Sequence, residues 1–284
     1  MRLLPLGVRG STPAPGLEFV HYGGHTSCVA VIPDGEERPT LLLDAGTGIR
    51  CAANLLAGRA FRGAILLSHL HWDHLLGLPF CTATDRPGAE AEVYLPAQDG
   101  LSGRDLVARI MSPPAFPITP EGLRGSWRFH AIEPSRFQVP GFDVRCAELA
   151  HKGGRTYGYR ITDGAASIAY LPDHSPARGC SDDVLELIDG VDVLLHDAQF
   201  LESERRIADA YGHATVGDAI ALAVRANVKT LVLFHHSPTR TDDELDGLAS
   251  TVAAPLPVIV ARQGHELPVP RPGVNRAQGA LSDR

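Results

Sequence analysis

The chain has very little lysine, because only Lys152 and Lys229 of its 26 Lys plus Arg residues are lysines. Its 33 Asp plus Glu residues leave a formal net charge of −7, which disfavours tight, sequence-independent binding of long nucleic acid. It also lacks the run of roughly 20 apolar residues that a membrane helix needs. The apolar part of the start, MRLLPLGVRG, is too short for a secretory segment. We therefore expect a cytoplasmic protein without a membrane partner.

Cysteine is also scarce, and no two cysteines form a Cys-x-x-Cys pair. Their number is odd and they lie far apart in the sequence, which favours free buried thiols over a disulfide framework or a cysteine zinc site. The five are Cys28, Cys51, Cys81, Cys146 and Cys180.

The 284 residues, 44% of them apolar and 21% charged, have the composition of a folded protein of about one or two domains. Short β-branched runs bounded by turn residues alternate with amphipathic segments, which predicts an α/β layered fold. We expect strands at 2–8, 28–33, 40–44, 64–69, 92–95, 142–149, 156–162, 167–171, 191–196, 230–235 and 257–261. We expect helices at 48–57, 101–111, 182–189, 202–210, 216–226 and 242–252.

Two of these helices carry capping signals, Thr215 with Asp218 and Thr241 with Glu244. No interior linker stands out, so we predict one domain over 1–267 and a frayed tail over 268–284. The Pro-rich stretch 112–125 is interpreted as a lid-like loop over a cleft, with an inert surface connection as the alternative.

Histidine gives the strongest signal, in the segment ILLSHLHWDHLLGLPF at 65–80. An apolar strand ends there and delivers His69, His71, Asp73 and His74 within six residues. Alternate positions of an extended backbone point the same way, so the first two histidines can share one ion. Imidazole and carboxylate ligands suit Zn, Mn or Fe, and the pattern therefore predicts a metal site in a polar cleft.

The same arrangement, a polar ligand after an apolar strand, recurs three times. His151 follows FDVRCAELA, Asp173 follows SIAYLP, and His235 follows KTLVLF. Because α/β folds place their chemistry at sheet edges, these residues can converge with the 69–74 motif on one cleft. Seven such ligands can hold two ions about 3.5 to 4 Å apart with a bridging water.

The motif H-x-H-x-D-H followed by His, Asp and His resembles the metallo-β-lactamase superfamily over nearly the whole chain, and TLLLDAGTGI at 40–49 is similar to its Asp-Gly-rich segment. The resemblance implies an αββα sandwich of two mixed β-sheets flanked by helices, with two divalent ions at one edge. It implies that one ion is held by His69, His71 and His151, the other by Asp73, His74 and His235, and that Asp173 bridges them. His236 is the alternative to His235. Zinc is the expected metal, with Mn or Fe as alternatives.

Five further segments, GGHTSC, HKGGRTYGYRI, YLPD, GHAT and LVLFHHSP, resemble the branch that contains ribonuclease Z and small phosphodiesterases. The branch implies His213 as a proton donor; the alternative is that it merely precedes the helix capped by Thr215. The chain lacks the P-x-K-x-R-N element and the basic arm with which ribonuclease Z grips transfer RNA, so cleavage of pre-tRNA is not expected. MSPPAFP at 111–117 instead resembles a loop of small, uncharacterised relatives that shapes a substrate pocket.

We therefore expect a metal-dependent hydrolase that attacks a small or cyclic phosphodiester, or a short oligonucleotide, through a metal-bridging hydroxide. Asp73 and His213 are the expected catalytic residues, and the substrate is a small anion. A lactone, thioester or amide hydrolase with the same two-metal site is an alternative, because the ligand set serves both chemistries. A non-catalytic metal-dependent binding module is a third possible function.

The resemblance also leaves open that the protein forms a homodimer. His21, His25, His174 and His236 are candidates for supporting the ligands, and Arg109, Arg155 and Arg160 for meeting a phosphate.

Overall fold

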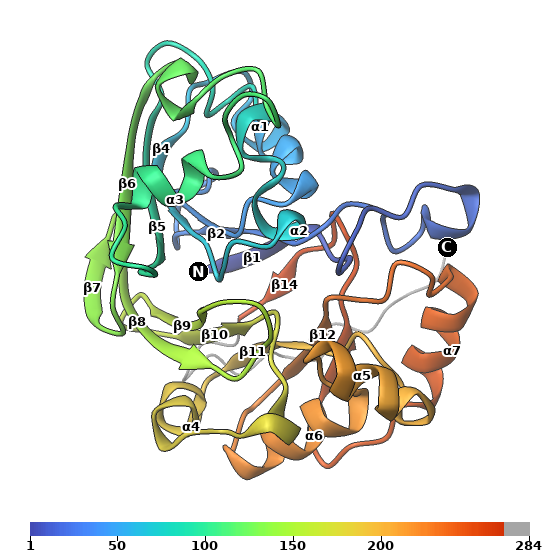
Figure 1. Ribbon diagram of the computed structural model, residues 1–284. Coiled ribbons are helices and arrows are strands. Elements are labelled where there is room, and N and C mark those ends of the chain that lie inside the picture. Colours follow the sequence, from blue (N-terminus) through green and yellow to red (C-terminus); the bar gives the residue numbers. More distant parts are fainter. Residues whose placement is uncertain (270–284) are drawn as a thin grey trace.

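The computed structural model describes residues 1–269, whose strands form two seven-stranded sheets. Figure 1 shows one sheet formed by strands coloured blue to green together with the red β14, and the other formed by strands coloured green to red. The first sheet contains, in spatial order, β14 (Leu267–Pro268), β1 (Arg2–Gly7), β2 (Cys28–Ile32), β3 (Leu41–Leu43), β4 (Arg62–Leu66), β5 (Glu90–Pro96) and β6 (Ser126–Ile132). The second contains β13 (Val258–Val260), β12 (Leu231–Phe234), β11 (Val193–Asp197), β10 (Ser167–Leu171), β9 (Thr156–Thr162), β8 (Phe142–Leu149) and β7 (Arg136–Val139).

Both sheets are mixed in the same way. Strands β3 to β6 of the first sheet run parallel, as do β10 to β13 of the second. The remaining neighbours in each sheet are antiparallel. Because parallel strands end at a common edge, each sheet presents several carboxyl ends side by side, which is where α/β folds place ligands.

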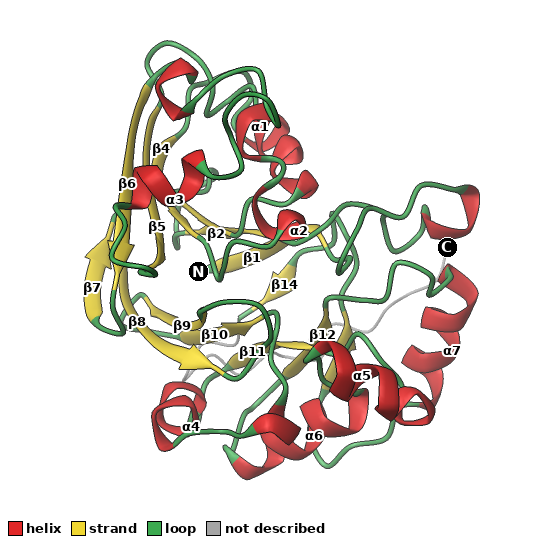
Figure 2. Cartoon of the chain, in the orientation of Figure 1, coloured by secondary structure: helices red, strands yellow, loops and turns green. Residues whose placement is uncertain are grey.

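Helices cover the outer face of each sheet (Figure 2). The α-helices are α1 (Ala52–Leu55), α2 (Trp72–Leu75), α3 (Gly103–Ala108), α4 (Asp182–Ile188), α5 (Arg205–Tyr211), α6 (Val216–Arg225) and α7 (Asp242–Thr251). Short 3₁₀ turns are η1 (Leu17–Phe19), η2 (Thr47–Cys51), η3 (Leu78–Phe80), η4 (Pro120–Gly122), η5 (Pro176–Arg178) and η6 (Glu202–Glu204). Both predicted capping boxes are present, at Thr215 with Asp218 and at Thr241 with Glu244.

The central core lies between the two sheets. Leu43 and Leu66 of the first sheet and Tyr159, Leu195 and Phe234 of the second belong to one cluster of fully buried side chains. Two further clusters pack the first sheet on α1 and α3, and the second on α4, α6 and α7. This confirms the predicted αββα sandwich.

The predicted strands all appear, with ends shifted by at most a few residues. Strands β6, β7 and β14 were not predicted, and the expected helix at 48–57 is a 3₁₀ turn followed by one turn of α-helix. The five cysteines are free, but Cys51 and Cys180 are only half-buried rather than buried as expected. Of the predicted tail 268–284, the structure describes only Pro268, which pairs with Arg2, and Val269; the rest lies outside the described residues. Within residues 1–269, no helix has the length and apolar character that crossing a membrane requires.

Candidate metal centre

The parallel strands deliver polar side chains to one edge between the sheets. Asp44 follows β3 and His69 follows β4 in the first sheet. In the second sheet Asp173 follows β10, Asp197 ends β11 and His235 follows β12. The buried apolar strands fix these positions, because shifting any of them would expose its core residues.

The first ligand group consists of His69, His71, His151 and Asp173, whose ligand atoms all lie within 4.8 Å of one another. His71 Nδ1 lies 3.4 Å from His151 Nε2. Asp173 Oδ2 lies 3.6 Å from His69 Nε2 and 3.5 Å from His151 Nε2.

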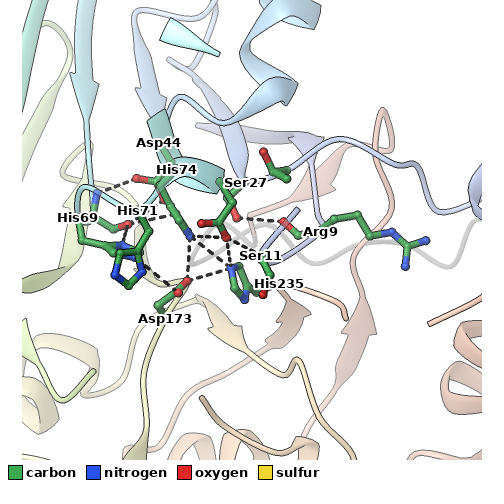
Figure 3. A network of polar contacts seen from close by, with 12 residues as sticks. Arg9, Ser11, Ser27, Asp44, His69, His71, His74, Asp173 and His235 are labelled. Atoms are coloured by element: carbon green, nitrogen blue, oxygen red, sulfur yellow. Dashed lines mark hydrogen bonds and ion pairs between the residues drawn. The ribbon is translucent and has the colours of Figure 1, made fainter. Parts of the chain in front are cut away.

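The second ligand group consists of Asp73, His74 and His235, and Asp173 also faces it. Asp73 Oδ2 lies 3.2 Å from the Nε2 atoms of both His74 and His235, which are 3.3 Å apart. Asp173 Oδ1 lies 3.1 Å from His74 Nε2 and 3.0 Å from His235 Nε2. The two oxygens of Asp173 thus face different groups, with Asp173 between them (Figure 3).

The atoms of both groups fit divalent cations. Four ligands about 2.1 Å from a tetrahedral Zn²⁺ stand about 3.4 Å apart, close to the separations in both groups. His69 Nε2 is buried without a hydrogen-bond partner, which is costly unless a cation satisfies it. The Nε2 atoms of His74 and His235 face a common point, where their lone pairs would be available to a cation once the protons they share with Asp73 and Asp173 leave.

The histidines of the first ligand group are poised as neutral ligands. Burial lowers the pKa of His69 well below its usual value, and the neighbouring imidazole of His74 adds to this. Burial likewise lowers the pKa of His71 and of His151. Neutral imidazole is the form that binds a metal ion.

The second ligand group is held together by opposite charges. Burial opposes the charge on His74, but Asp73, Asp173 and Asp44 raise its pKa well above the usual value. Burial would raise the pKa of Asp73, yet His74 and the hydrogen bond from His235 lower it. A cation entering this group would take over the role of the imidazolium proton, so that binding releases a proton.

A buried carboxylate, Asp44, supports two of the three motif histidines, His74 directly and His69 through Ser68. It is fully buried and accepts hydrogen bonds from Ser68 N at 2.6 Å, Ser68 Oγ at 2.9 Å and Tyr170 OH at 2.7 Å. It also lies 2.7 Å from His74 Nδ1, and Ser68 Oγ lies 3.0 Å from His69 Nδ1. Protons held on these Nδ1 atoms leave both Nε2 atoms free for a metal.

Two further contacts involve the backbone. His151 Nδ1 donates to Gly212 O at 2.7 Å, and Ser11 N donates to Asp73 Oδ2 at 2.7 Å. Ser11 and His235 have left-handed backbones, with φ of 63° and 60°. Such strain at non-glycine residues clusters at functional sites.

His213 lies beside both ligand groups. Its Nδ1 lies 2.8 Å from Asp197 Oδ2 and 3.9 Å from Asp173 Oδ2, and its ring stacks on His235. Burial opposes protonation, but the Asp197 carboxylate outweighs it and raises the pKa of His213 to about 9. Asp197 itself is held by the backbone amides of His174 and Gln199.

The cluster opens into a cavity of about 910 Å³, which we call the metal cleft. Its lining includes four of the predicted ligands together with His213 and one lysine, Lys152. The lining residues are Ser11, Leu70, His71, Trp72, Asp73, His151, Lys152, Gly153, Asp173, Gln199, Phe200, Tyr211, His213, Ser237, Pro238 and Thr239.

The structure brings all seven predicted ligands and His213 into this one cluster. Their roles stay predictions. His235 faces Asp173, whereas His236 Nε2 bonds to Ala261 O and burial lowers the pKa of His236 to about 3. His236 is therefore turned away from the ligand groups.

Sequence reasoning did not select Asp44 and Asp197. Each follows or ends an apolar strand, LLL or VLLHD, which is the same signal that identified Asp173.

The other expected supporting residues bond elsewhere. His25 Nδ1 lies near Thr47 Oγ1, His174 Nδ1 near His196 Nε2, and the exposed His21 pairs with Asp246. Each of the three arginines that we considered for phosphate is paired away from the metal cleft: Arg109 bonds to Asp99, Arg155 to Glu148 and Glu133, and Arg160 to the carbonyls of Leu187 and Asp189.

Comparisons with known proteins agree with this architecture. The family model described as the β-lactamase superfamily domain matches residues 40–236. Ribonuclease Z of Nocardia farcinica is 30% identical over 256 residues, covering 72% of this chain and 80% of that protein.

Two solved structures show the same fold. A diphosphatase from the PhnP family has a TM-score of 0.71 at 21% identity, covering 95% of this chain and 98% of its own. The metallo-β-lactamase fold protein YhfI from Bacillus subtilis has a TM-score of 0.68 at 20% identity, with 94% and 98% covered. The fold implies binding of a divalent metal, and His and Asp clusters that could hold one are present. The chain therefore belongs to the metallo-β-lactamase superfamily and is a hydrolase with relatives among the ribonucleases Z.

Proposed function

We propose that this hydrolase cleaves the phosphodiester bond of a small anionic substrate, linear or cyclic, or of a short oligonucleotide. The observation that carries the proposal is the position of His213, which is anchored on Asp197 at the wall of the metal cleft and adjacent to Asp173. A phosphodiester releases an alkoxide that needs a proton, and an imidazole at this place can supply one.

The two ligand groups would hold two divalent cations, of which we propose zinc because the set is rich in imidazole, with Mn or Fe as alternatives. Bound there, such cations make water a stronger acid and polarise phosphoryl oxygens. Asp73 lines the cleft and is fixed by Ser11 N, so it is placed to orient or deprotonate the attacking water. His213, whose Nδ1 is anchored on Asp197, keeps Nε2 to donate a proton to the departing oxygen.

Lys152 is the one Lys or Arg among the residues that line the metal cleft, and its Nζ donates to Ala210 O at 3.1 Å. A single such side chain suits a small anion, whereas a long nucleic acid needs a series of them. This supports the small substrate.

The test compares substrates on protein reconstituted with Zn, Mn or Fe. Bis(4-nitrophenyl) phosphate and a panel of 4-nitrophenyl esters and lactones are assayed in parallel. We expect turnover of the diester; turnover of the carboxylic substrates alone would favour the ester, lactone or amide alternative. No turnover of any of them by protein that carries its metals would favour a binding module.

The role of His213 is tested by His213→Ala. Metal content should stay unchanged, and the rate on a diester with an alkoxide leaving group should fall by about 100- to 10,000-fold. The loss should be smaller with 4-nitrophenolate, which leaves without a proton. His265→Ala removes an exposed histidine outside the cleft and is the matched control. An unchanged rate with the alkoxide leaving group would contradict the assignment.

A further inference from the structure

A second cavity of about 400 Å³ shares the lining residue Trp72 with the metal cleft, and we call it the apolar pocket. It lies between α2 with η3 on one side and α3 with the following loop on the other. Arg109 is its one charged lining residue, and the Arg109 guanidinium is bonded to Asp99 at 2.6 Å. The lining residues are Trp72, Leu75, Leu76, Leu78, Pro79, Val107, Arg109, Ile110, Met111, Ala115 and Phe116.

The floor of the apolar pocket is part of the core, whereas its rim is open. Leu78 and Val107 are essentially buried and belong to the cluster that packs the first sheet on its helices. Trp72 is 70% exposed and Leu76 45% exposed, and no other segment within residues 1–269 covers them. Exposed apolar surface that leads into a preformed hollow is typical of a ligand site.

Trp72 joins the two cavities, because it lines both of them. It stands between His71 and Asp73 in the chain, so one candidate ligand from each group is its direct neighbour. A substrate that has its reacting group in the metal cleft and also enters the apolar pocket therefore passes Trp72.

We infer that the apolar pocket is a substrate subsite that takes an uncharged apolar substituent, an alkyl chain or a plain aromatic ring, of the anionic substrate. The inference rests on the proposed function, because it assumes that the phosphate end of the substrate lies in the metal cleft beside Lys152. The one charged side chain that lines the apolar pocket, Arg109, is already paired with Asp99, and the other lining side chains are apolar. The MSPPAFP segment forms one wall of the apolar pocket, through Met111, Ala115 and Phe116. Its role would be to select the substituent of the substrate.

The two tryptophans of the chain allow a direct binding test. In Trp127→Phe protein loaded with Zn²⁺, Trp72 is the sole tryptophan and reports on the pocket. Octyl phosphate should shift Trp72 emission to the blue, whereas methyl phosphate should not. Each buried methylene contributes about fourfold in affinity, so octyl phosphate should bind at least about tenfold more tightly than methyl phosphate even if only two methylenes are buried.

Two substitutions should abolish this preference in different ways. Leu76→Asp places a charge at the rim, and Ala115→Phe fills the pocket without adding charge. Val224→Asp, on α6, is the matched control because Val224 is also 45% exposed and lines neither cavity. Circular dichroism checks that each variant is folded.

Equal affinity for the two phosphates, or an octyl preference unchanged in both pocket variants, would overturn the inference. So would a Trp72 emission that follows protein concentration and dimer formation but not octyl phosphate, since a second copy would then cover the pocket. Hydrolysis of octyl and methyl 4-nitrophenyl phosphates is measured separately. If neither is cleaved while octyl phosphate still binds tightly, the proposed phosphodiesterase function fails and the subsite stands.

Discussion

Two ligand groups flank Asp173, and they differ in what lies behind them. The histidines of the second group are deep, because His74 and His235 are fully buried and His74 is held by the Asp44 carboxylate, whereas Asp73 of this group reaches the metal cleft. The first group is more open: two of its three histidines, His71 and His151, line the metal cleft, and His151 is held by a backbone carbonyl of Gly212.

The difference concerns affinity and access. A carboxylate behind an imidazole raises its basicity and fixes its orientation more strongly than a neutral carbonyl does. We therefore expect the deep group to bind its cation more tightly, and the open group to exchange its cation more readily and to lie nearer the substrate. The predictions that follow test this contrast, beginning with the residue that the two groups share.

Asp173→Asn should have the largest effect, because one change weakens both groups. Metal content, measured by elemental analysis, should fall well below two equivalents per chain. Removal of a group that only hydrogen-bonds to a metal ligand lowers activity about 10- to 100-fold. The loss of activity in Asp173→Asn should be larger than that. Asp192→Asn changes a buried carboxylate that bonds to Ser167 and Lys229, outside the metal cleft, and should leave metal content unchanged. Two full equivalents in Asp173→Asn would refute the bridging position.

His74→Ala and His71→Ala should separate the two groups. Removal of His74 leaves the buried Asp44 and Asp73 carboxylates without their cation, which costs about 3 to 5 kcal/mol of unfolding free energy. Removal of the more exposed His71 should cost less than about 1 kcal/mol while the protein loses about one equivalent of metal. Urea unfolding of the metal-free variants measures the difference. Equal destabilisation would show that the groups are not distinct in this way.

Asp44→Asn should lower metal affinity at the deep group by about 10- to 100-fold. Tyr170→Phe removes only one of the hydrogen bonds to Asp44 and should have a smaller effect in the same direction. Calorimetric titration with Zn²⁺ resolves the tight step from the weak one. If Asp44→Asn weakened only the weaker of the two Zn²⁺ binding steps, the deep group would be the one that binds its cation less tightly, contrary to our expectation.

Gly212→Ala should have the smallest effect, confined to the open group. Gly212 has a φ of 82°, and an added Cβ would lie 3.1 Å from the Cβ of Lys152. A left-handed alanine costs about 1 to 2 kcal/mol of stability. Gly190→Ala carries a similar backbone cost, at a φ of 61°, but has no neighbour within 4 Å. Only Gly212→Ala should weaken the second metal step, by a few-fold; an equal change in Gly190→Ala would point to general destabilisation.

The fold was largely predictable because its strands are short, apolar and bounded by turn residues. Strands β8 and β9 have the predicted ends, since buried residues alternate with more exposed ones along the whole of β8 and fill most of β9. Strand β7 escaped prediction because it is a four-residue edge strand with only one buried residue. Helix α2, also four residues long, is too short to show helical periodicity.

The candidate site was predictable where ligands cluster in sequence or match a family motif. The supporting carboxylates Asp44 and Asp197 stand alone in the sequence, and a lone Asp after a strand is most often a turn residue. Their roles appear only once the sheets place Asp44 behind His74 and Asp197 behind His213. The apolar pocket forms only where α2 with η3 meets α3 with the following loop. The periodicity of apolar residues within one segment does not predict such a meeting of two segments.

A crystal of the zinc-loaded protein, with anomalous scattering recorded at the zinc edge, tests the central claim most directly. The account predicts two peaks on opposite sides of Asp173, one surrounded by His69, His71 and His151 and the other by Asp73, His74 and His235. A single peak, or peaks away from these side chains, would contradict it.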